Sequence, residues 1–168
     1  MSIPVEIERK YVILKPDFAV LEGEYEVKVS EIWQTYLMSE AGVTRRVRKR
    51  VYSDKVSYTL TEKRRIDTIS SLEDEREISE GEYEALLGEM REGTRTLTKT
   101  RRVIRIGEVD FEIDEYPEWV RTCIMETELK SRDEQVTMPD FVKIIAEVSG
   151  VKAYTNASMA AHFPEELI

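Results

Sequence analysis

The chain has 168 residues, of which 41% are hydrophobic and 35% are charged. A chain of this length forms one domain with a substantial core, and its charged fraction exceeds the roughly 25% usual for soluble domains. The formal net charge of −9 argues against a general affinity for nucleic acid or anionic membranes. We expect one domain over residues 1–168 that binds neither.

The sequence excludes several common kinds of site and anchor. The N-terminus lacks the pattern of a signal peptide, and no apolar run approaches the length of a membrane span. Cys123 is the only cysteine and His162 the only histidine, which leaves Cys/His zinc sites and histidine-dependent triads poorly supported. We therefore expect a cytoplasmic protein whose chemistry rests on carboxylates, lysines, arginines and hydroxyls.

Alternation of polar and apolar residues predicts eight strands. In chain order they cover residues 5–14, 31–38, 44–51, 56–64, 72–78, 97–106, 108–116 and 123–130. Helices are predicted over residues 79–93, which open with a Ser79–Glu82 capping box, over 138–148, and over 156–163, which follow an Asn156 cap. The pattern favours an α+β fold built on a closed eight-stranded antiparallel barrel, a tunnel with helices packed outside it.

Charged residues recur at every second position of these strands, beginning with the stretch EIERK at residues 6–10. Successive side chains on a strand point to opposite faces, so the members of each pair share a face. The basic pairs are Arg46 with Arg48 and Lys99 with Arg101, joined by Lys10 and Lys63. The acidic sets are Glu6 with Glu8, Glu73 with Glu75 and Glu77, Glu112 with Asp114, and Glu126 with Glu128.

Such a pair is most often the solvated face of a half-buried sheet, but a solvated face has no reason to separate its signs by strand. Residues between the charges, such as Ile7, Val47 and Phe111, are apolar and suit an exterior covered by helices. We therefore expect a charged interior. Guanidinium groups bind phosphate oxygens bidentately, and carboxylates with water hold Mg²⁺ or Mn²⁺. The ladders predict a site for a polyphosphate and a divalent metal.

The ordered set of motifs resembles the CYTH domain, the triphosphate tunnel metalloenzyme family. The hallmark Glu-x-Glu-x-Lys strand corresponds to Glu6, Glu8 and Lys10. WQTYL, RVR, LTEK, EDEREIS, KTRR, FEIDEY, METEL and VSGVKAYTNASMA resemble the family's later segments, in order. The resemblance extends over the whole chain and implies an eight-stranded tunnel that binds a triphosphate with divalent metal.

The resemblance also implies roles for individual residues. Metal-ligand candidates are Glu6, Glu8, Glu126, Glu128 and Asp114, for Mg²⁺ or Mn²⁺. Candidates for gripping the phosphates are Lys10, Arg46, Arg48, Lys63, Lys99 and Arg101. Glu75, Glu77, Glu112 and Asp114 would hold a second metal or position the attacking water, and with Glu6, Glu8 and Lys10 they form the expected catalytic set. Because Glu73 shares the face of Glu75, the sequence allows the register of that strand to shift by two residues.

These residues favour metal-dependent hydrolysis of a triphosphate, with inorganic tripolyphosphate as the leading substrate. The alternatives are a class IV adenylyl cyclase, a thiamine triphosphatase, or a non-catalytic polyphosphate- or nucleotide-binding module. The partner expected is a small triphosphate, and the chain is expected to be a monomer or homodimer. Tyr154 and Asn156 are expected near the tunnel end, and His162 is expected to be a surface or packing residue.

Overall fold

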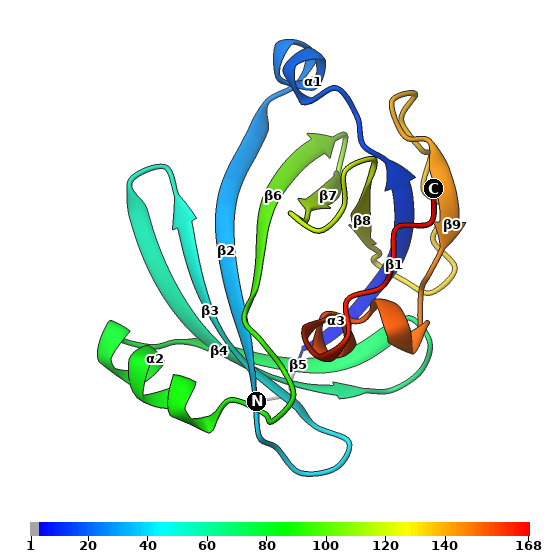
Figure 1. The fold of residues 1–168 in the computed structure, drawn as a ribbon. Coiled ribbons are helices and arrows are strands. Elements are labelled where there is room, and N and C mark those ends of the chain that lie inside the picture. Colours follow the sequence, from blue (N-terminus) through cyan, green and yellow to red (C-terminus); the bar gives the residue numbers. More distant parts are fainter. Residues whose placement is uncertain (1–3) are drawn as a thin grey trace.

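The computed structural model describes residues 4–168, and this range contains nine strands in one antiparallel sheet. The strands are β1 (Val5–Leu14), β2 (Val27–Leu37), β3 (Thr44–Tyr52), β4 (Lys55–Arg65), β5 (Ser70–Glu77), β6 (Leu97–Ile106), β7 (Val109–Glu115), β8 (Thr122–Glu128) and β9 (Ile144–Glu147). Their order is β5-β4-β3-β2-β6-β7-β8-β1-β9, and pairing of β5 with β1 closes the first eight into a barrel (Figure 1). The predicted α+β barrel is confirmed.

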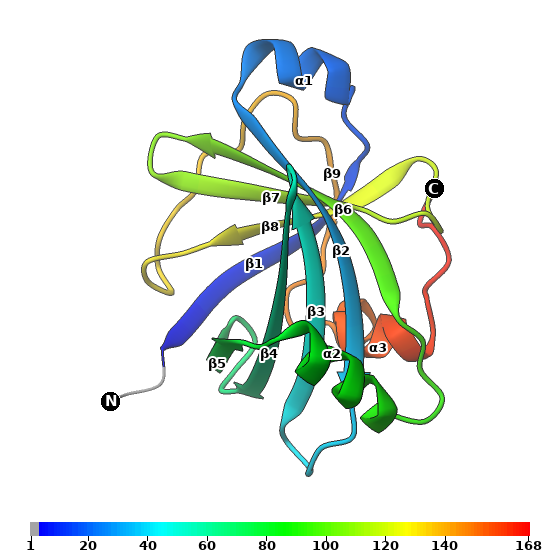
Figure 2. The same cartoon turned by 90° about the vertical axis from the view of Figure 1, so that its left-hand side faces the viewer.

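Alternation along the strands gives the barrel a charged interior and an apolar exterior, as predicted. On β7, Glu112 faces the lumen, while Phe111 and Ile113 point the other way and are buried. They pack with Met125 of β8 and with Leu21 of α1 (Phe18–Glu24), which lies outside the barrel (Figures 1 and 2). Burial of each such side chain contributes about 1.5–3 kcal/mol relative to exposure.

A second helix, α2 (Glu80–Leu86), also packs outside the barrel and continues into the short 3₁₀ helix η1 (Leu87–Glu89). It begins as predicted, with the Ser79 hydroxyl accepting a hydrogen bond from the backbone N–H of Glu82 at 3.1 Å. Its Tyr83 packs on the outward-facing Val47 and Leu60. The helix covers the outward-facing apolar side chains of β3 and β4.

The last helix, α3 (Asn156–Ala161), follows the 3₁₀ helix η2 (Lys152–Tyr154) and lies against one end of the barrel (Figure 2). Its Met159 and Ala160 pack on Val12, Leu97 and Ile124, which share strand faces with the lumen charges. Its N-cap is Thr155 rather than the predicted Asn156. Apolar packing therefore closes this end of the lumen.

The predicted helix over residues 138–148 is wrong. Residues 138–143 are irregular, with a turn at Asp140 and Phe141, and β9 (Ile144–Glu147) pairs with Tyr11–Ile13 of β1, outside the eight-stranded barrel. Phe141 and Val142 pack on the outer apolar face beside α1. The apolar residues that suggested a helical stripe are instead divided between a strand and a loop covering the barrel.

Two smaller differences concern the segment before β2. α1 was not predicted, and β2 begins at Val27 rather than near residue 31.

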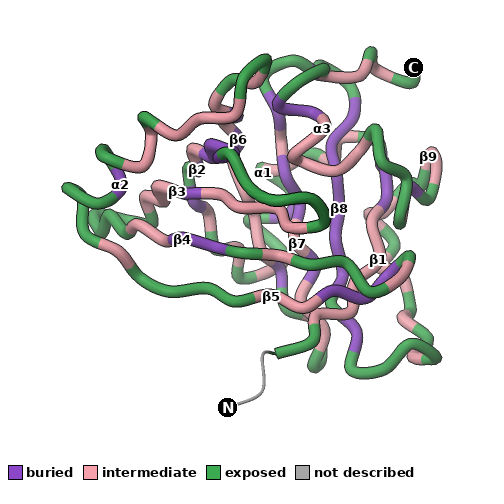
Figure 3. Tube along the Cα trace, turned by 90° about the horizontal axis from the view of Figure 1, so that it is seen from below, coloured by how far each residue is buried: buried purple, intermediate pink, exposed green. Residues whose placement is uncertain are grey.

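None of the helices in residues 4–168 is long and apolar enough to cross a membrane. Figure 3 shows that β8 is buried almost throughout, whereas much of β5 is exposed. The barrel is thus packed on the β8 side and more open on the β5 side.

Candidate active site

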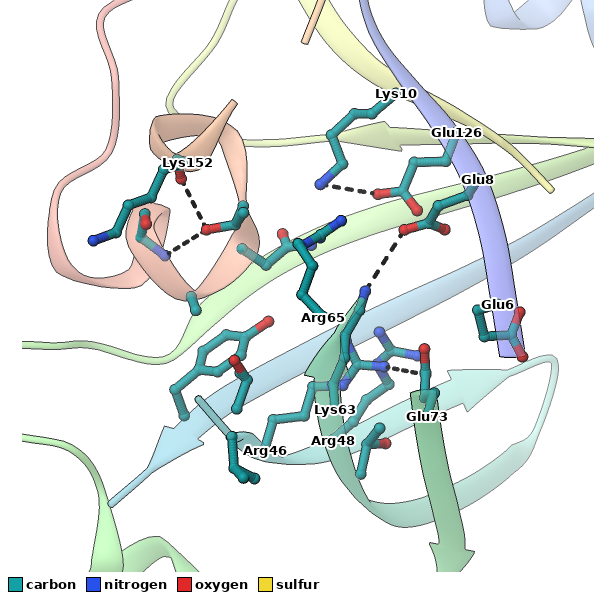
Figure 4. A pocket seen from close by; sticks show the side chains of 18 of the residues that line it. Glu6, Glu8, Lys10, Arg46, Arg48, Lys63, Arg65, Glu73, Glu126 and Lys152 are labelled. Atoms are coloured by element: carbon teal, nitrogen blue, oxygen red, sulfur yellow. Dashed lines mark hydrogen bonds and ion pairs between the residues drawn. The ribbon is translucent and has the colours of Figure 1, made fainter. Parts of the chain in front are cut away.

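A cavity of about 830 Å³ occupies the lumen and is lined by charged side chains from seven of the barrel strands. The acidic lining residues are Glu6, Glu8, Glu73, Glu75, Glu112, Glu126 and Glu128. The basic ones are Lys10, Arg46, Arg48, Lys63, Arg65, Arg91, Arg101 and Lys152. Figure 4 shows many of these side chains pointing toward one another across the cavity. Charges of both signs therefore face one volume.

Most of the predicted site residues line this cavity. They are Glu6, Glu8, Lys10, Arg46, Arg48, Lys63, Glu75, Arg101, Glu112, Glu126 and Glu128. Lys99 and Asp114 are instead buried in the wall, and Glu77 lies at the exposed end of β5. The acids that β5 contributes to the lining are Glu73 and Glu75, which decides the register left open by the sequence.

The acidic wall forms where β1 pairs with β8. The register places Glu8 opposite Glu128 and Lys10 opposite Glu126, so the ladders of two distant strands adjoin. Lys10 Nζ lies 3.4 Å from Glu126 Oε1. Burial and the neighbouring Glu128 raise the pKa of Glu6 to about 7, and repulsion from Glu126 together with burial raises the pKa of Glu8 to about 7. This wall carries more negative charge than its bases neutralise.

This acidic excess fits a divalent cation. Carboxylates close enough to raise one another's pKa lose that repulsion when a hard cation binds between them. Within residues 4–168, no three carboxyl, imidazole or thiol groups already converge on one point as metal ligands. Mg²⁺ commonly binds one or two carboxylates and completes its shell with water and substrate phosphates, which suits such an arrangement.

The basic wall lies on β3 and β4. Arg46 Nη2 is 3.5 Å from Glu73 Oε1, and Lys63 Nζ is 3.7 Å from Glu8 Oε1 (Figure 4). Burial and repulsion from Arg46 and Arg101 lower the pKa of Arg48 to about 9. Positive charges on this wall therefore repel one another, just as the negative charges on β1 and β8 do.

A buried cluster joins β6 to β7 behind the cavity. Arg101 donates to both carboxylate oxygens of Asp114, at 2.7 and 2.9 Å, and Lys99 Nζ lies 2.8 Å from the same carboxylate. Although burial raises the pKa of Asp114, these two cations hold it well below its usual range. Arg101 also pairs with Glu112 at 2.8 Å. The cluster satisfies its own charges, which suits a structural support of the lumen.

No protein-family model and no curated protein matches the chain. Among solved structures, the inorganic triphosphatase NE1496 is 25% identical over 95% of this chain and 96% of its own, with a TM-score of 0.60. This similarity covers nearly the whole of both chains. It agrees with the two earlier observations, the barrel and the ordered charge ladders. In fold and in the order of its charged motifs the chain resembles the CYTH, or triphosphate tunnel, family.

Other CYTH-like structures share the fold at lower identity. The PH1819 protein of Pyrococcus horikoshii is 21% identical over 76% of this chain and 80% of its own, with a TM-score of 0.59. HpAC1 of Hippeastrum, described as a candidate adenylyl cyclase with a dominant triphosphatase activity, is 17% identical over 75% of this chain and 80% of its own, with a TM-score of 0.52. These likenesses support the fold of the family.

Several residues that line the lumen were not among the predicted site residues, although Lys152 lies where the resembling family often has a basic residue. Arg65 follows Lys63 at the next same-face position of β4, so continuing the alternation would have found it. Arg91, Lys152 and His162 line the cavity from outside the barrel strands, where no alternation marks them. His162 was expected to be a surface or packing residue; it is exposed and lies at the cavity.

Proposed function

We propose that this protein hydrolyses a triphosphate bound in the lumen, with Mg²⁺ or Mn²⁺, and that inorganic tripolyphosphate is its leading substrate. The observation that supports this most is the separation of an acidic wall on β1 and β8 from a basic wall on β3 and β4 around one cavity. A phosphate chain with its metal neutralises both walls together. A simple anion would neutralise only one.

The basic wall supplies the phosphate grip in this proposal. Arg46, Arg48 and Lys63 line the cavity on β3 and β4, and Lys10 approaches from β1. Guanidinium groups offer paired donors to phosphate oxygens, whereas a lysine ammonium acts as a compact charge. Together they hold the phosphate chain along the wall, and they stabilise the negative charge spread over the transferred phosphoryl group in the transition state.

The acidic wall would hold the metal through Glu6, Glu8, Glu126 and Glu128. The bound metal would polarise phosphate oxygens and neutralise their charge. Asp114, also expected as a ligand, is engaged by Lys99 and Arg101, and in this proposal it orients Arg101. The proposed metal ligands are therefore the four glutamates of β1 and β8.

Water must be oriented for attack on a terminal phosphorus. Glu75 lines the cavity from β5 and is held by a hydrogen bond from Thr61 at 2.8 Å, whereas Glu112 lines it from β7, opposite Glu126 in the strand register. Burial raises the pKa of Glu112, which makes its carboxylate a better proton acceptor. Attack forms a new P–O bond, breaks the anhydride bond to pyrophosphate, and releases a water proton to the carboxylate.

The lining favours an inorganic substrate over a nucleotide. Among the cavity-lining residues of the described chain, the aromatic side chains are Tyr36, which is only 3% exposed, and one exposed ring, the small imidazole of His162. Recognition of a base commonly uses exposed aromatic rings for stacking. The lumen instead presents charge along its length, which suits a chain of phosphates without an organic group.

The proposal is tested by incubating the protein with tripolyphosphate, thiamine triphosphate and ATP, each with Mg²⁺ or Mn²⁺, and measuring orthophosphate, pyrophosphate and cyclic AMP. We expect tripolyphosphate to give orthophosphate and pyrophosphate in equal amounts, and Glu6→Ala/Glu8→Ala to abolish turnover. Cyclic AMP from ATP would identify a cyclase instead. Tight triphosphate binding without turnover of any substrate would indicate a binding module.

A further inference from the structure

The six residues expected to grip phosphate differ in how far their charge is already neutralised. Five of them pair with acids: Lys10 with Glu126, Arg46 with Glu73, Lys63 with Glu8, and Lys99 and Arg101 with Asp114. Arg48 differs, since within residues 4–168 it forms no ion pair and its side-chain partner is the amide of Gln34. Gln34 was not among the residues predicted from the sequence.

Gln34 holds Arg48 in a defined geometry. The two residues face each other in the β2–β3 register, and Gln34 is fully buried. Its Oε1 accepts from Arg48 Nε at 3.0 Å and from Nη2 at 2.5 Å. Because a guanidinium can only donate, the oxygen of the amide must face Arg48, and Nε2 donates to the Tyr36 hydroxyl at 3.2 Å.

A neutral partner has a particular consequence for a buried arginine. Two hydrogen bonds to one oxygen fix the guanidinium plane, as a carboxylate would, but the amide does not cancel the positive charge. Burial and repulsion from Arg46 and Arg101 outweigh the attraction of Asp114, so the charge of Arg48 is only partly compensated. The unbalanced charge at Arg48 is therefore available to an anion that enters the cavity.

We propose that Gln34 is a positioning residue that orients Arg48 while leaving its charge unneutralised, and that Arg48 is thereby the principal anchor of the phosphate chain. This inference rests on the proposed function, because it assigns a role within the same phosphate site. Among the six expected residues it distinguishes one free anchor from five whose acidic partners must first be displaced or neutralised. The other cavity-lining bases also lack an ion pair in the described chain, but Arg65 and Lys152 are exposed and Arg91 donates to the Ala157 carbonyl.

Two near-isosteric substitutions of Gln34 distinguish the effect of an added negative charge from the effect of losing the hydrogen bonds that orient Arg48. Gln34→Glu keeps an acceptor for Arg48 but adds a negative charge, whereas Gln34→Met removes the hydrogen bonds and adds none. Gln135→Glu is the matched control, because it makes the same charge change at an exposed position of the loop after β8. Each variant is compared with the wild-type chain by calorimetric binding of tripolyphosphate, by kcat and KM with Mg²⁺, and by thermal unfolding.

We expect Gln34→Glu to weaken tripolyphosphate binding by about tenfold or more, with a raised KM and an unchanged or raised Tm. Gln34→Met is expected to weaken binding less, and Gln135→Glu to leave it unchanged. If Gln34 had only a structural role, the order would reverse, because Glu retains the hydrogen bonds to Arg48 that Met loses. Binding by Gln34→Glu equal to that of the wild type, or tighter than that of Gln34→Met, overturns the inference.

Different results would overturn the proposed function and the role of Gln34. Absence of tripolyphosphate binding by the wild-type chain overturns the proposed function, and this inference with it. Wild-type binding with the reversed variant order overturns the inference alone. Should Gln34→Glu fail to fold, Arg48→Gln is compared with Lys63→Gln: a larger loss of binding for Arg48→Gln is expected, and an equal or smaller loss overturns the assignment of Arg48 as the anchor.

Discussion

Asp114 is the residue on which the buried charges of β6 and β7 depend. Its side chain is 1% exposed, and it pairs with both Lys99 and Arg101. Removing one partner of a buried ionic cluster leaves the remaining charges desolvated and unpaired, which costs more than the pair itself contributes. The position therefore influences folding strongly, whatever it contributes to catalysis.

We expect Asp114→Asn to lower the free energy of unfolding by about 3–5 kcal/mol, measured by urea denaturation without ligand. Asp110→Asn is the matched control, because Asp110 pairs with Arg105 on the exposed surface of the same hairpin. That surface pair is expected to contribute at most about 1 kcal/mol. Equal effects of the two substitutions would contradict the structural role given to Asp114.

The connection from β9 to η2 is the element that places α3 at the barrel end. Lys10 donates to the Tyr154 carbonyl at 3.1 Å, and the Lys10 backbone N–H donates to the Ser149 hydroxyl at 2.9 Å. Gly150 has a φ of +70° and packs closely on the turn between β4 and β5. A Cβ at this glycine would lie 2.5 Å from Thr68 Cγ2 and 3.0 Å from its carbonyl oxygen.

Gly150→Ala is therefore expected to destabilise the protein by about 1–3 kcal/mol, through both strain and steric overlap. Hydrogen exchange should show the loss concentrated in residues 148–162. Gly107→Ala separates the two causes: Gly107 has a φ of +63° with no neighbouring atom within 4 Å in the described chain, so it reports strain alone. If the two substitutions cost the same, close contact with Thr68 has no energetic role.

The segment over residues 138–148 shows where element prediction from sequence fails. Phe141, Ile144 and Ile145 have helical spacing, but a short apolar run fits a strand or a packed loop equally well. The free edge of β1 decides between them, because it offers backbone hydrogen bonds to Ile144–Glu147. By contrast, the long alternating strands and the Ser79 cap were predictable, since local geometry alone specifies them.

At the scale of the whole molecule, repulsion among the acidic side chains of the lumen opposes folding in one pH range. Glu6 and Glu8 have pKa values raised from 4.5 to about 7, so the folded chain binds protons more tightly than the unfolded chain. Between about 4.5 and 7, stability therefore increases as the pH falls, and decreases as the pH rises through 7.

We expect Tm measured in EDTA to rise as the pH is lowered from about 8 to about 5, because protonation relieves repulsion among the acids. Glu6→Gln/Glu8→Gln should flatten this dependence. Added Mg²⁺ should raise Tm more at pH 8 than at pH 5, since protons and metal compete for the same carboxylates. A wild-type Tm that falls steadily over this range would contradict the electrostatic account of the acidic wall.

The sequence by itself determined the barrel strands, the face that each charge occupies and the candidate site residues, because alternation along a strand is a local property. It also indicated the family, through motifs in a fixed order. Only the tertiary structure decided which charges meet: that Arg101 and Lys99 share Asp114, that Glu73 rather than Glu77 reaches the cavity, and that Arg48 faces the amide of Gln34. These pairings depend on strand register and barrel closure, which bring together residues far apart in the chain.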